Sequence, residues 1–260
     1  MFGDVTSANV VGYQSFTVQG TDATGKVKYY MIGFQFKGVQ EGQDRIKLGD
    51  AINMGDIPAF SGAWRENAKA PMVQIHNGAA YDVYYYFKAG TSGLKEVLTK
   101  DSWVDKNKYI ANDVYVDLGR SFWFSDKGLG TETGTLTLAG SVKTEATAPI
   151  VLTGADIQML ANPFPMSVSV DSIGCTLTPF SGAWRENAKA PQIQVYNGSA
   201  YDVYYWFKAG TTGLKDVLTK DSWVNKNKYI ATNDILESGE GFWLVNKNNE
   251  AGTLTFNYAQ

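Results

Sequence analysis

The sequence predicts an all-β protein built from two tandem homologous units, each a β-sandwich or barrel-like fold with at most short helical turns. Two observations support this. Short runs of β-branched and aromatic residues alternate with Gly, Asn and Asp turn signals every 8 to 12 residues or so, which is typical of all-β chains. A long internal repeat divides the chain in two. A hydrophobic content of 44% is enough to form a buried core.

The repeat sets the predicted domain boundaries. A shift of 120 residues aligns residues 60–111 with 180–231, and only nine of these 52 positions differ. The twelve residues FSGAWRENAKAP are identical at 60–71 and 180–191, whereas KYYMIGFQF (28–36) matches IQMLANPFP (157–165) only loosely. We therefore predict a first unit at residues 1–143 and a second at 144–260, forming either two similar domains or one pseudo-symmetric body.

Each unit is expected to open and close with a strand. The segments NVVGYQSFTV (9–18) and TLTFNYAQ (253–260) are predicted as open terminal strands, which two copies of the protein could pair by strand addition. Within the first unit, SFWFS (121–125) and GTLTLAGSV (134–142) are predicted as its last two strands. The segment TSGLKEVLTKDSWV (91–104) has apolar residues at helical spacing, so we expect one helical turn there, before a strand at Trp103.

The segment MVQIHNGAAYDVYYYFK (72–88) predicts a β-hairpin. A three-residue loop at 77–79 places Ile75 opposite Tyr81 and Val73 opposite Val83, so that apolar residues face each other. An even-numbered loop would put Ile75 opposite Asp82 and is rejected for that reason. This register turns an aromatic set outward, which comprises Tyr84 and Tyr86 with His76 in the first unit, and Tyr204 and Trp206 with Tyr196 in the second.

This outward aromatic face has three possible covers: another layer of the same protein, a partner subunit, or a sugar that stacks on the rings. The identical connector between strand and hairpin is the second candidate surface. Phe60 and Trp64 are expected to anchor it to the core, while its polar residues lie exposed at a contact between repeats or subunits. Recent duplication alone is the competing explanation. The connector residues concerned are Arg65, Glu66, Asn67 and Lys69, with Arg185, Glu186, Asn187 and Lys189.

Composition argues against most catalytic and cofactor chemistry. The 23 basic and 26 acidic residues are mixed along the chain, without the basic stripe that binds nucleic acid. The single histidine, His76, is replaced by Tyr196 in the second unit, and one His with the lone Cys175 cannot supply a zinc site. The carboxylates shared by both units are expected to be turn and strand-edge residues, and a calcium site at DKNK (105–108) is a weak candidate. We expect no enzyme activity and no cofactor.

Several phrases resemble a known group of proteins. These are SANVVGYQ (7–14), ANPFPMSVSVDSI (161–173), YDVYYYFKAG (81–90) and GEGFWL (239–244). Together they are similar to uncharacterised, secreted, β-rich repeat proteins of verrucomicrobial and related bacteria. The resemblance implies export and a β fold, but no established activity.

The function predicted from these observations is structural. We expect a secreted or cell-surface protein, its signal peptide removed, that associates with itself into a filament, sheet or surface layer through equivalent faces and terminal strands. The alternative is a carbohydrate-binding module that uses the outward tyrosines and tryptophan. No apolar run reaches the roughly 20 residues that a membrane-spanning helix needs.

Overall fold

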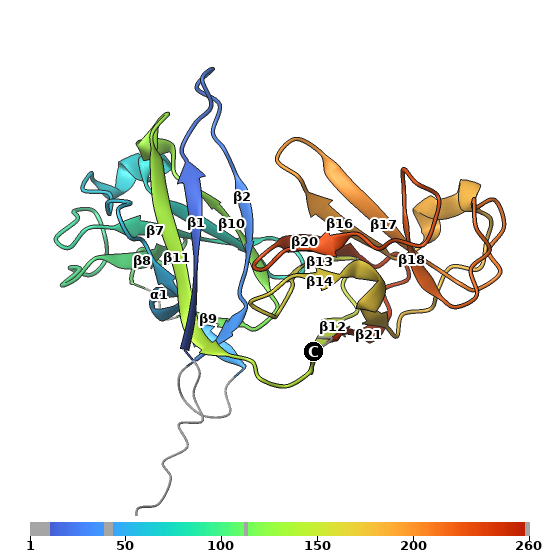
Figure 1. The fold of residues 1–260 in the computed structure, drawn as a ribbon. Coiled ribbons are helices and arrows are strands. Elements are labelled where there is room, and N and C mark those ends of the chain that lie inside the picture. Colours follow the sequence, from blue (N-terminus) through green and yellow to red (C-terminus); the bar gives the residue numbers. More distant parts are fainter. Residues whose placement is uncertain (1–10, 39–43, 112–113, 258–260) are drawn as a thin grey trace, which may run out of the picture.

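The computed structural model describes residues 11–38, 44–111 and 114–257. Strands make up 45% of the structure and helices 9%, so the all-β prediction is confirmed. Every sheet draws its strands from one side only of the 143–146 segment. We call residues 11–142 the first unit and residues 147–257 the second unit; Figure 1 shows them side by side.

The first unit contains a four-stranded sheet, a five-stranded sheet and a strand pair. The first sheet has the order β1-β11-β3, with β5 also paired to β11: β1 (Val11–Gln19), β11 (Thr133–Val142), β3 (Phe36–Lys37) and β5 (Ile52–Asn53). The second has the order β2 (Tyr30–Gly33), β10 (Ser121–Ser125), β6 (Met72–His76), β7 (Tyr81–Phe87) and β8 (Ser102–Asp105). The pair is β4 (Arg45–Lys47) with β9 (Tyr115–Asp117), and the helices are α1 (Leu48–Ala51) and the 3-10 helices η1 (Trp64–Lys69) and η2 (Lys127–Leu129).

The second unit repeats this plan. Its sheets are β12 (Thr147–Thr153), β21 (Ala251–Asn257) and β15 (Gly174–Cys175), then β13 (Ile157–Ala161), β20 (Gly241–Val245), β16 (Gln192–Tyr196), β17 (Tyr201–Phe207) and β18 (Ser222–Asn225). The remaining elements are the pair β14 (Val168–Ser169) with β19 (Ile235–Leu236), and the 3-10 helices η3 (Val170–Ser172) and η4 (Trp184–Lys189). The strands β12, β21, β14 and β19 are shorter than their counterparts in the first unit.

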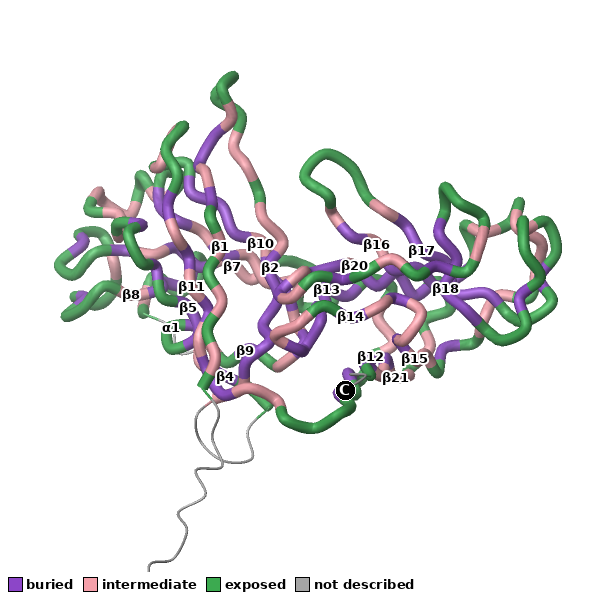
Figure 2. The backbone as a smooth tube through the Cα atoms, in the orientation of Figure 1, coloured by how far each residue is buried: buried purple, intermediate pink, exposed green. Residues whose placement is uncertain are grey.

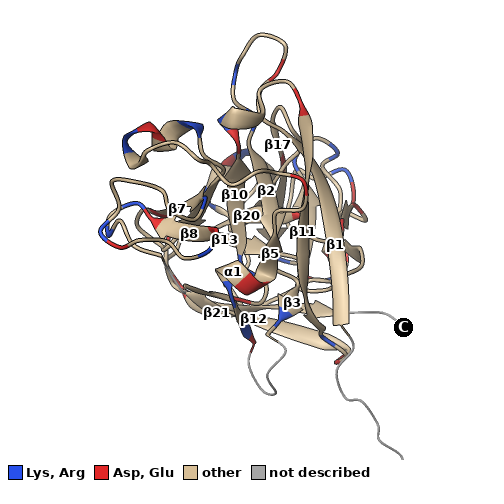
Figure 3. Cartoon of the chain, turned by 90° about the vertical axis from the view of Figure 1, so that its left-hand side faces the viewer, with Lys and Arg blue, Asp and Glu red and all other residues tan. Residues whose placement is uncertain are grey.

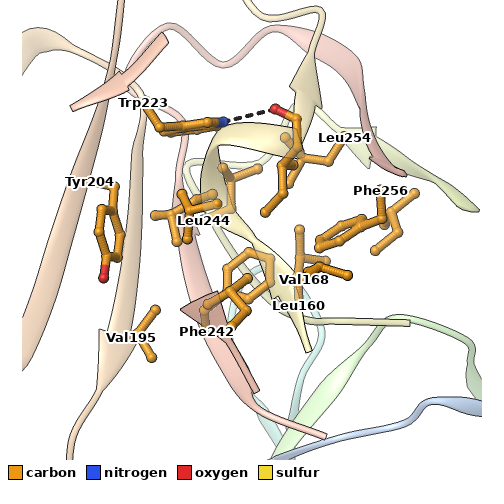
Figure 4. Packing of buried hydrophobic residues seen from close by; sticks show 14 of the residues in the cluster. Leu160, Val168, Val195, Tyr204, Trp223, Phe242, Leu244, Leu254 and Phe256 are labelled. Carbon is orange, nitrogen blue, oxygen red and sulfur yellow. Dashed lines mark hydrogen bonds between the residues drawn. The ribbon is translucent and has the colours of Figure 1, made fainter. Parts of the chain in front are cut away.

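Each unit has its own core between its sheets. In the second unit the core gathers Leu160, Phe242, Leu244, Leu254 and Phe256, all of them fully buried (Figure 4). The Trp223 indole closes one side and donates to the Ile173 carbonyl oxygen at 3.1 Å (Figure 4). The core of the first unit is equivalent, and no residue belongs to both clusters. Figure 2 shows the buried strands at the centre of each unit and the exposed loops at the outer ends.

The predicted hairpin exists, but its predicted register is wrong. Ile75 lies opposite Asp82 and Val73 opposite Tyr84, so the loop has four residues, 77–80. The Asn77 side chain fixes this loop by accepting hydrogen bonds from the Ala79 and Ala80 amides at 3.1 and 2.9 Å. One extra loop residue reverses the face of every β7 side chain.

The four aromatic residues predicted to face outward therefore point into the cores. Tyr84, Tyr204 and Trp206 are buried, and Tyr86 is half-buried against Trp103 at a ring distance of 5.1 Å. The opposite face of β7 is covered as well, because Tyr85 and Phe87 pack against the connector. Both faces of this strand are buried, which corrects the assignment of these residues to an interaction surface.

Two further expectations are corrected. Residues 91–101 form turns rather than a helical turn, and helical structure occurs instead at α1 and in the connector. The C-terminal strand is not an open edge, because β21 lies between β12 and β15; residues 258–260 of the predicted strand lie outside the described residues. The predicted N-terminal strand is confirmed from Val11 onward as β1, which pairs along its whole length with β11 of its own unit.

The upstream segments of the two units align one residue away from the sequence match. Met31 lies opposite Trp123 in β10, and Met159 lies opposite Trp243 in β20. Because Trp123 and Trp243 are repeat equivalents, MIGFQF (31–36) corresponds to MLANPF (159–164). This alignment identifies which residues of the two units are equivalent at the junction.

Contacts across the junction come in matched pairs. The Gly33 amide donates to the Gly239 carbonyl oxygen at 2.9 Å, and the Ala161 amide donates to the Gly119 carbonyl oxygen at 2.8 Å. Isolated bridges likewise join Ile32 to Glu240 and Leu160 to Arg120. Exchanging the two units converts one contact of each pair into the other. The units therefore meet through equivalent surfaces, related by an approximate two-fold axis. The chain is one pseudo-symmetric body.

Candidate interaction surfaces

The identical connector forms a 3-10 helix at each outer end of the molecule. We call η1 with residues 88–101 and Tyr109 the first end surface, and η4 with residues 208–221 and Tyr229 the second end surface. They lie at opposite sides of the body, away from the junction (Figure 1). The prediction that the connector lies between the two repeats is therefore wrong. A contact between subunits stays a prediction.

The predicted polar residues of the connector lie on the surface. Arg65, Glu66 and Lys69 are exposed and Asn67 is half-buried, and their repeat equivalents in η4 have the same burial. Glu66 pairs with Lys69 at 3.8 Å and Glu186 with Lys189 at 3.5 Å. Exposed ion pairs of this kind contribute only about 0 to 1 kcal/mol, so they leave these groups available to a partner.

Aromatic packing holds each connector in place, as predicted for Phe60 and Trp64. The Trp64 ring lies 5.4 Å from Phe87 and 5.8 Å from Tyr85, and the Trp64 amide donates to the Ser92 carbonyl oxygen at 3.1 Å. The equivalent Trp184 lies 5.5 Å from both Phe207 and Tyr205. Each end surface is thus a fixed shape rather than a free loop.

A tyrosine in a rare backbone conformation completes each end surface. Tyr109 and Tyr229 have φ of 59° and 60°, in the left-handed region. This conformation costs a non-glycine residue about 1–2 kcal/mol. It places each ring 4.8 Å from the tryptophan of its connector, with a lysine ammonium over the other side at 5.7 Å in the first unit and 5.9 Å in the second. Sequence reasoning missed both tyrosines because a positive φ leaves no pattern in a non-glycine residue.

Both ends are basic, although the whole chain is acidic. Residues 60–111 contain seven basic and five acidic residues, and residues 180–231 contain seven and four. The rest of the chain carries nine basic and 17 acidic residues. All seven basic residues of each segment are exposed. Figure 3 looks at the first end and shows charged residues of both signs on its outer loops.

The nine differences between residues 60–111 and 180–231 fall mainly in the interior. Five are at positions buried in at least one unit: 72, 73, 75, 86 and 105, with their equivalents 120 residues later. Only three are at positions exposed in both units. The interior has therefore changed more than the exposed end surfaces, which is the opposite of what packing constraints alone produce.

The junction carries a second set of aromatic side chains. The Trp123 ring lies 5.5 Å from Tyr196, and by the pseudo-symmetry His76 lies 5.4 Å from Trp243. Tyr81 and Tyr201, at the start of β7 and β17, flank these pairs and are 41% and 40% exposed. Of the residues predicted to face outward, His76 and Tyr196 are half-buried at the junction. Burial lowers the pKa of the His76 imidazole, which favours its neutral form.

Within the described residues, no group of three or more His, Cys, Asp or Glu side chains is placed to hold a metal ion. Burial raises the pKa of the Cys175 thiol to about 12, which suppresses its thiolate. None of the helices in this part of the chain is long and apolar enough to cross a membrane.

Comparisons with known proteins return no relatives. No protein-family model matches the chain, and neither a curated protein nor a solved structure is similar to it.

Proposed function

We propose that this is an exported structural protein, derived by internal duplication, whose two equivalent end surfaces bind further copies of the same chain. The observation that carries the proposal is the identity of the exposed connector at both ends, set against the changes in the interior beneath it. A body with the same surface at both ends is bivalent. Bivalent association of a single protein extends into chains or layers.

Charge favours one arrangement of neighbours. Two end surfaces, each with a net positive charge, repel each other, whereas the remainder of the chain has an excess of eight acidic residues. We infer that an end surface docks on a second copy outside its end surfaces, where acidic residues are in excess. Each copy then has two end surfaces that can dock and one acidic region that can receive an end surface of another copy. This supports a branched or layered assembly rather than a simple end-to-end filament.

The test compares the assembly state of charge-reversed variants by light scattering. The variants are Arg65→Glu with Lys69→Glu at one end, and the same changes with Arg185→Glu and Lys189→Glu at both. We expect the parent to form assemblies that grow with protein concentration. The one-end variant keeps one end surface and its acidic region, so it should form smaller, unbranched assemblies, and the two-end variant should be a monomer. Raising the salt concentration from about 0.05 M to 0.5 M should weaken the assemblies of the parent, because salt screens exposed charges.

The control reverses two exposed basic residues outside the end surfaces, Lys26→Glu with Arg45→Glu. It changes the net charge as much as the one-end variant does. Because it makes the part of the chain that receives an end surface more acidic, it should leave assembly intact or strengthen it. A parent that stays monomeric at high concentration and low salt would overturn the proposal. Recent duplication alone would then explain the identical connectors.

A further inference from the structure

A groove of about 940 Å³ opens at the junction between the two units. One wall is the hairpin formed by residues 20–28, between β1 and β2 of the first unit, and the other is the tip of the β16–β17 hairpin of the second (Figure 1). Residues of β2 also line the groove. Grooves of this size between domains, lined by aromatic rings and a few polar groups, are the usual form of a ligand site.

The pseudo-symmetry supplies an internal comparison for this groove. The equivalent region on the other side of the axis consists of two pockets of about 210 Å³ each, which we together call the smaller groove. The lining of one includes His76, Thr153, Gln158 and Arg120, and that of the other includes Pro149, Ile150, Val151 and Arg120. The difference arises from the connection between the first two strands of each unit. It comprises ten residues, 20–29, in the first unit and three residues, 154–156, in the second. Only the longer connection builds a wall over the junction.

The enlarged groove is also the aromatic one. Its lining includes Phe16, Tyr29, Tyr30 and Tyr196. The equivalents of Phe16, Tyr30 and Tyr196 in the smaller groove are Ile150, Gln158 and His76, as the strand pairings show. The wall and the aromatic side chains therefore occur together, on one side of the axis.

Two of the lining rings, Tyr29 and Tyr196, belong to a continuous row of ring contacts. Tyr29, which is 46% exposed, lies 6.4 Å from the Trp123 ring. Trp123 lies 5.5 Å from Tyr196, which in turn lies 5.3 Å from Tyr201. The row thus runs from the wall of the first unit to the hairpin of the second.

The wall is held in place by polar contacts. Asp22 accepts hydrogen bonds from the Thr24 and Lys26 amides at 2.8 and 3.0 Å, which closes the tip. At the base, the Gln19 amide donates to the Tyr30 hydroxyl at 2.8 Å. Because these contacts fix the hairpin before any ligand arrives, little conformational entropy is lost on binding.

We propose that this groove binds a segment of a neutral polysaccharide. Sugar rings have apolar faces that pack on aromatic rings and hydroxyl groups that need hydrogen-bond partners, and the groove offers both. Tyr29 and Tyr196 line the groove and supply the rings, and the Trp123 ring lies next to both of them. The polar lining includes the Thr17 hydroxyl and the Glu240 carboxylate, and its two lysines are balanced by Asp22 and Glu240. A balanced lining favours an uncharged ligand over a polyanion.

The test measures retention of the full chain in affinity electrophoresis gels that contain a soluble polysaccharide. The neutral probes are a mixed-linkage β-glucan, a xylan and a galactomannan, and alginate is the polyanionic probe. We expect retardation by at least one neutral probe and about tenfold weaker binding in Tyr29→Ala, the loss expected for a central aromatic contact. The matched control is Tyr115→Ala, since Tyr115 is 44% exposed and lines the smaller groove.

The readout separates this site from the assembly surfaces. Binding of the β-glucan, xylan or galactomannan should also quench tryptophan emission, because Trp123 lies in the row of rings, and the two-end charge variant should bind as the parent does. Retention on none of the neutral probes, or on alginate alone, would overturn the proposal. So would equal binding by Tyr29→Ala and the parent.

Discussion

Trp64 and Trp184 show how single residues define the end surfaces. Each indole is clamped between the β7 or β17 aromatics and a tyrosine with positive φ. The ring contact and the neighbouring lysine offset a backbone cost of about 1–2 kcal/mol. Strain kept at the same place in both units is consistent with selection on the surface that it shapes. The sequence indicated the tryptophan anchor but not the tyrosine.

Asp126 provides a prediction at the scale of one residue. Its carboxyl group is buried, and burial raises its pKa to about 6, against the stabilising hydrogen bond from the Gly128 amide at 2.8 Å. The folded protein therefore binds this proton more tightly than the unfolded chain does. Its contribution to stability is largest below about pH 4 and is lost as the pH rises to about 6. The repeat equivalent is Asn246, which is also buried and cannot ionise.

We predict that Asp126→Asn stabilises the protein at pH 7 by about 1 kcal/mol and reduces the fall in its stability between pH 4 and 6. The gain is smaller than the full pKa shift implies, because an amide oxygen accepts a weaker hydrogen bond from Gly128 than a carboxylate does. Thermal melts from pH 4 to 8 measure the effect. The exposed Asp50→Asn is the control and should follow the parent. A variant with the pH profile of the parent would contradict the assignment.

At the scale of elements, the sequence predicted which strands form but not how they are offset. Alternation of polar and apolar residues reveals a register only where one face of a strand is exposed. In β7, Tyr84 faces the core and Tyr85 faces the connector, and both are buried, so either register looks apolar on its inner side. The contact that sets the register is local, because the Asn77 side chain caps a four-residue loop. The hydrophobic pattern does not show whether a loop has an odd or an even number of residues.

The register predicts how two tyrosines of β17 differ. Tyr204 is 5% exposed and packs near Val195 and Trp223 in the core, whereas Tyr201 is 40% exposed (Figure 4). Tyr204→Ala should lower the free energy of unfolding by about 3 kcal/mol, since it leaves a large cavity. Tyr201→Ala should cost less than about 1 kcal/mol. Urea denaturation measures both, and a larger loss for Tyr201→Ala would restore the register that the sequence alone suggested.

At the scale of the whole molecule, the pseudo-two-fold axis decides which surfaces are available. Equivalent surfaces of the two units cover each other at the junction, so they cannot bind another copy. The end surfaces face away from the axis and remain open. The repeat could be read from the sequence, but the arrangement of the two units could not. Two units related by a two-fold axis and two units stacked head to tail have the same linear sequence. The aromatic groove depends on this symmetry and on one long connection, 20–29, so it was missed as well.

The junction itself can be tested at its closest approach. A methyl group on Gly33 would lie 2.2 Å from the Ala161 side-chain carbon, far inside normal contact. Because Gly33 and Ala161 are equivalent positions in β2 and β13, the axis has room for one methyl group and not two. We predict that Gly33→Ala separates the units while each keeps its own core, which gives a lower first melting transition and a larger radius of gyration in X-ray scattering.

The double variant Gly33→Ala with Ala161→Gly tests the mechanism. It moves the single methyl group across the axis, so it should recover most of the stability and compactness that Gly33→Ala loses. Gly49→Ala is the control for adding a methyl group, because nothing lies within 4 Å of that position. If the double variant is no more stable than Gly33→Ala, the loss comes from strand β2 itself. The two units would then not be held together at this contact.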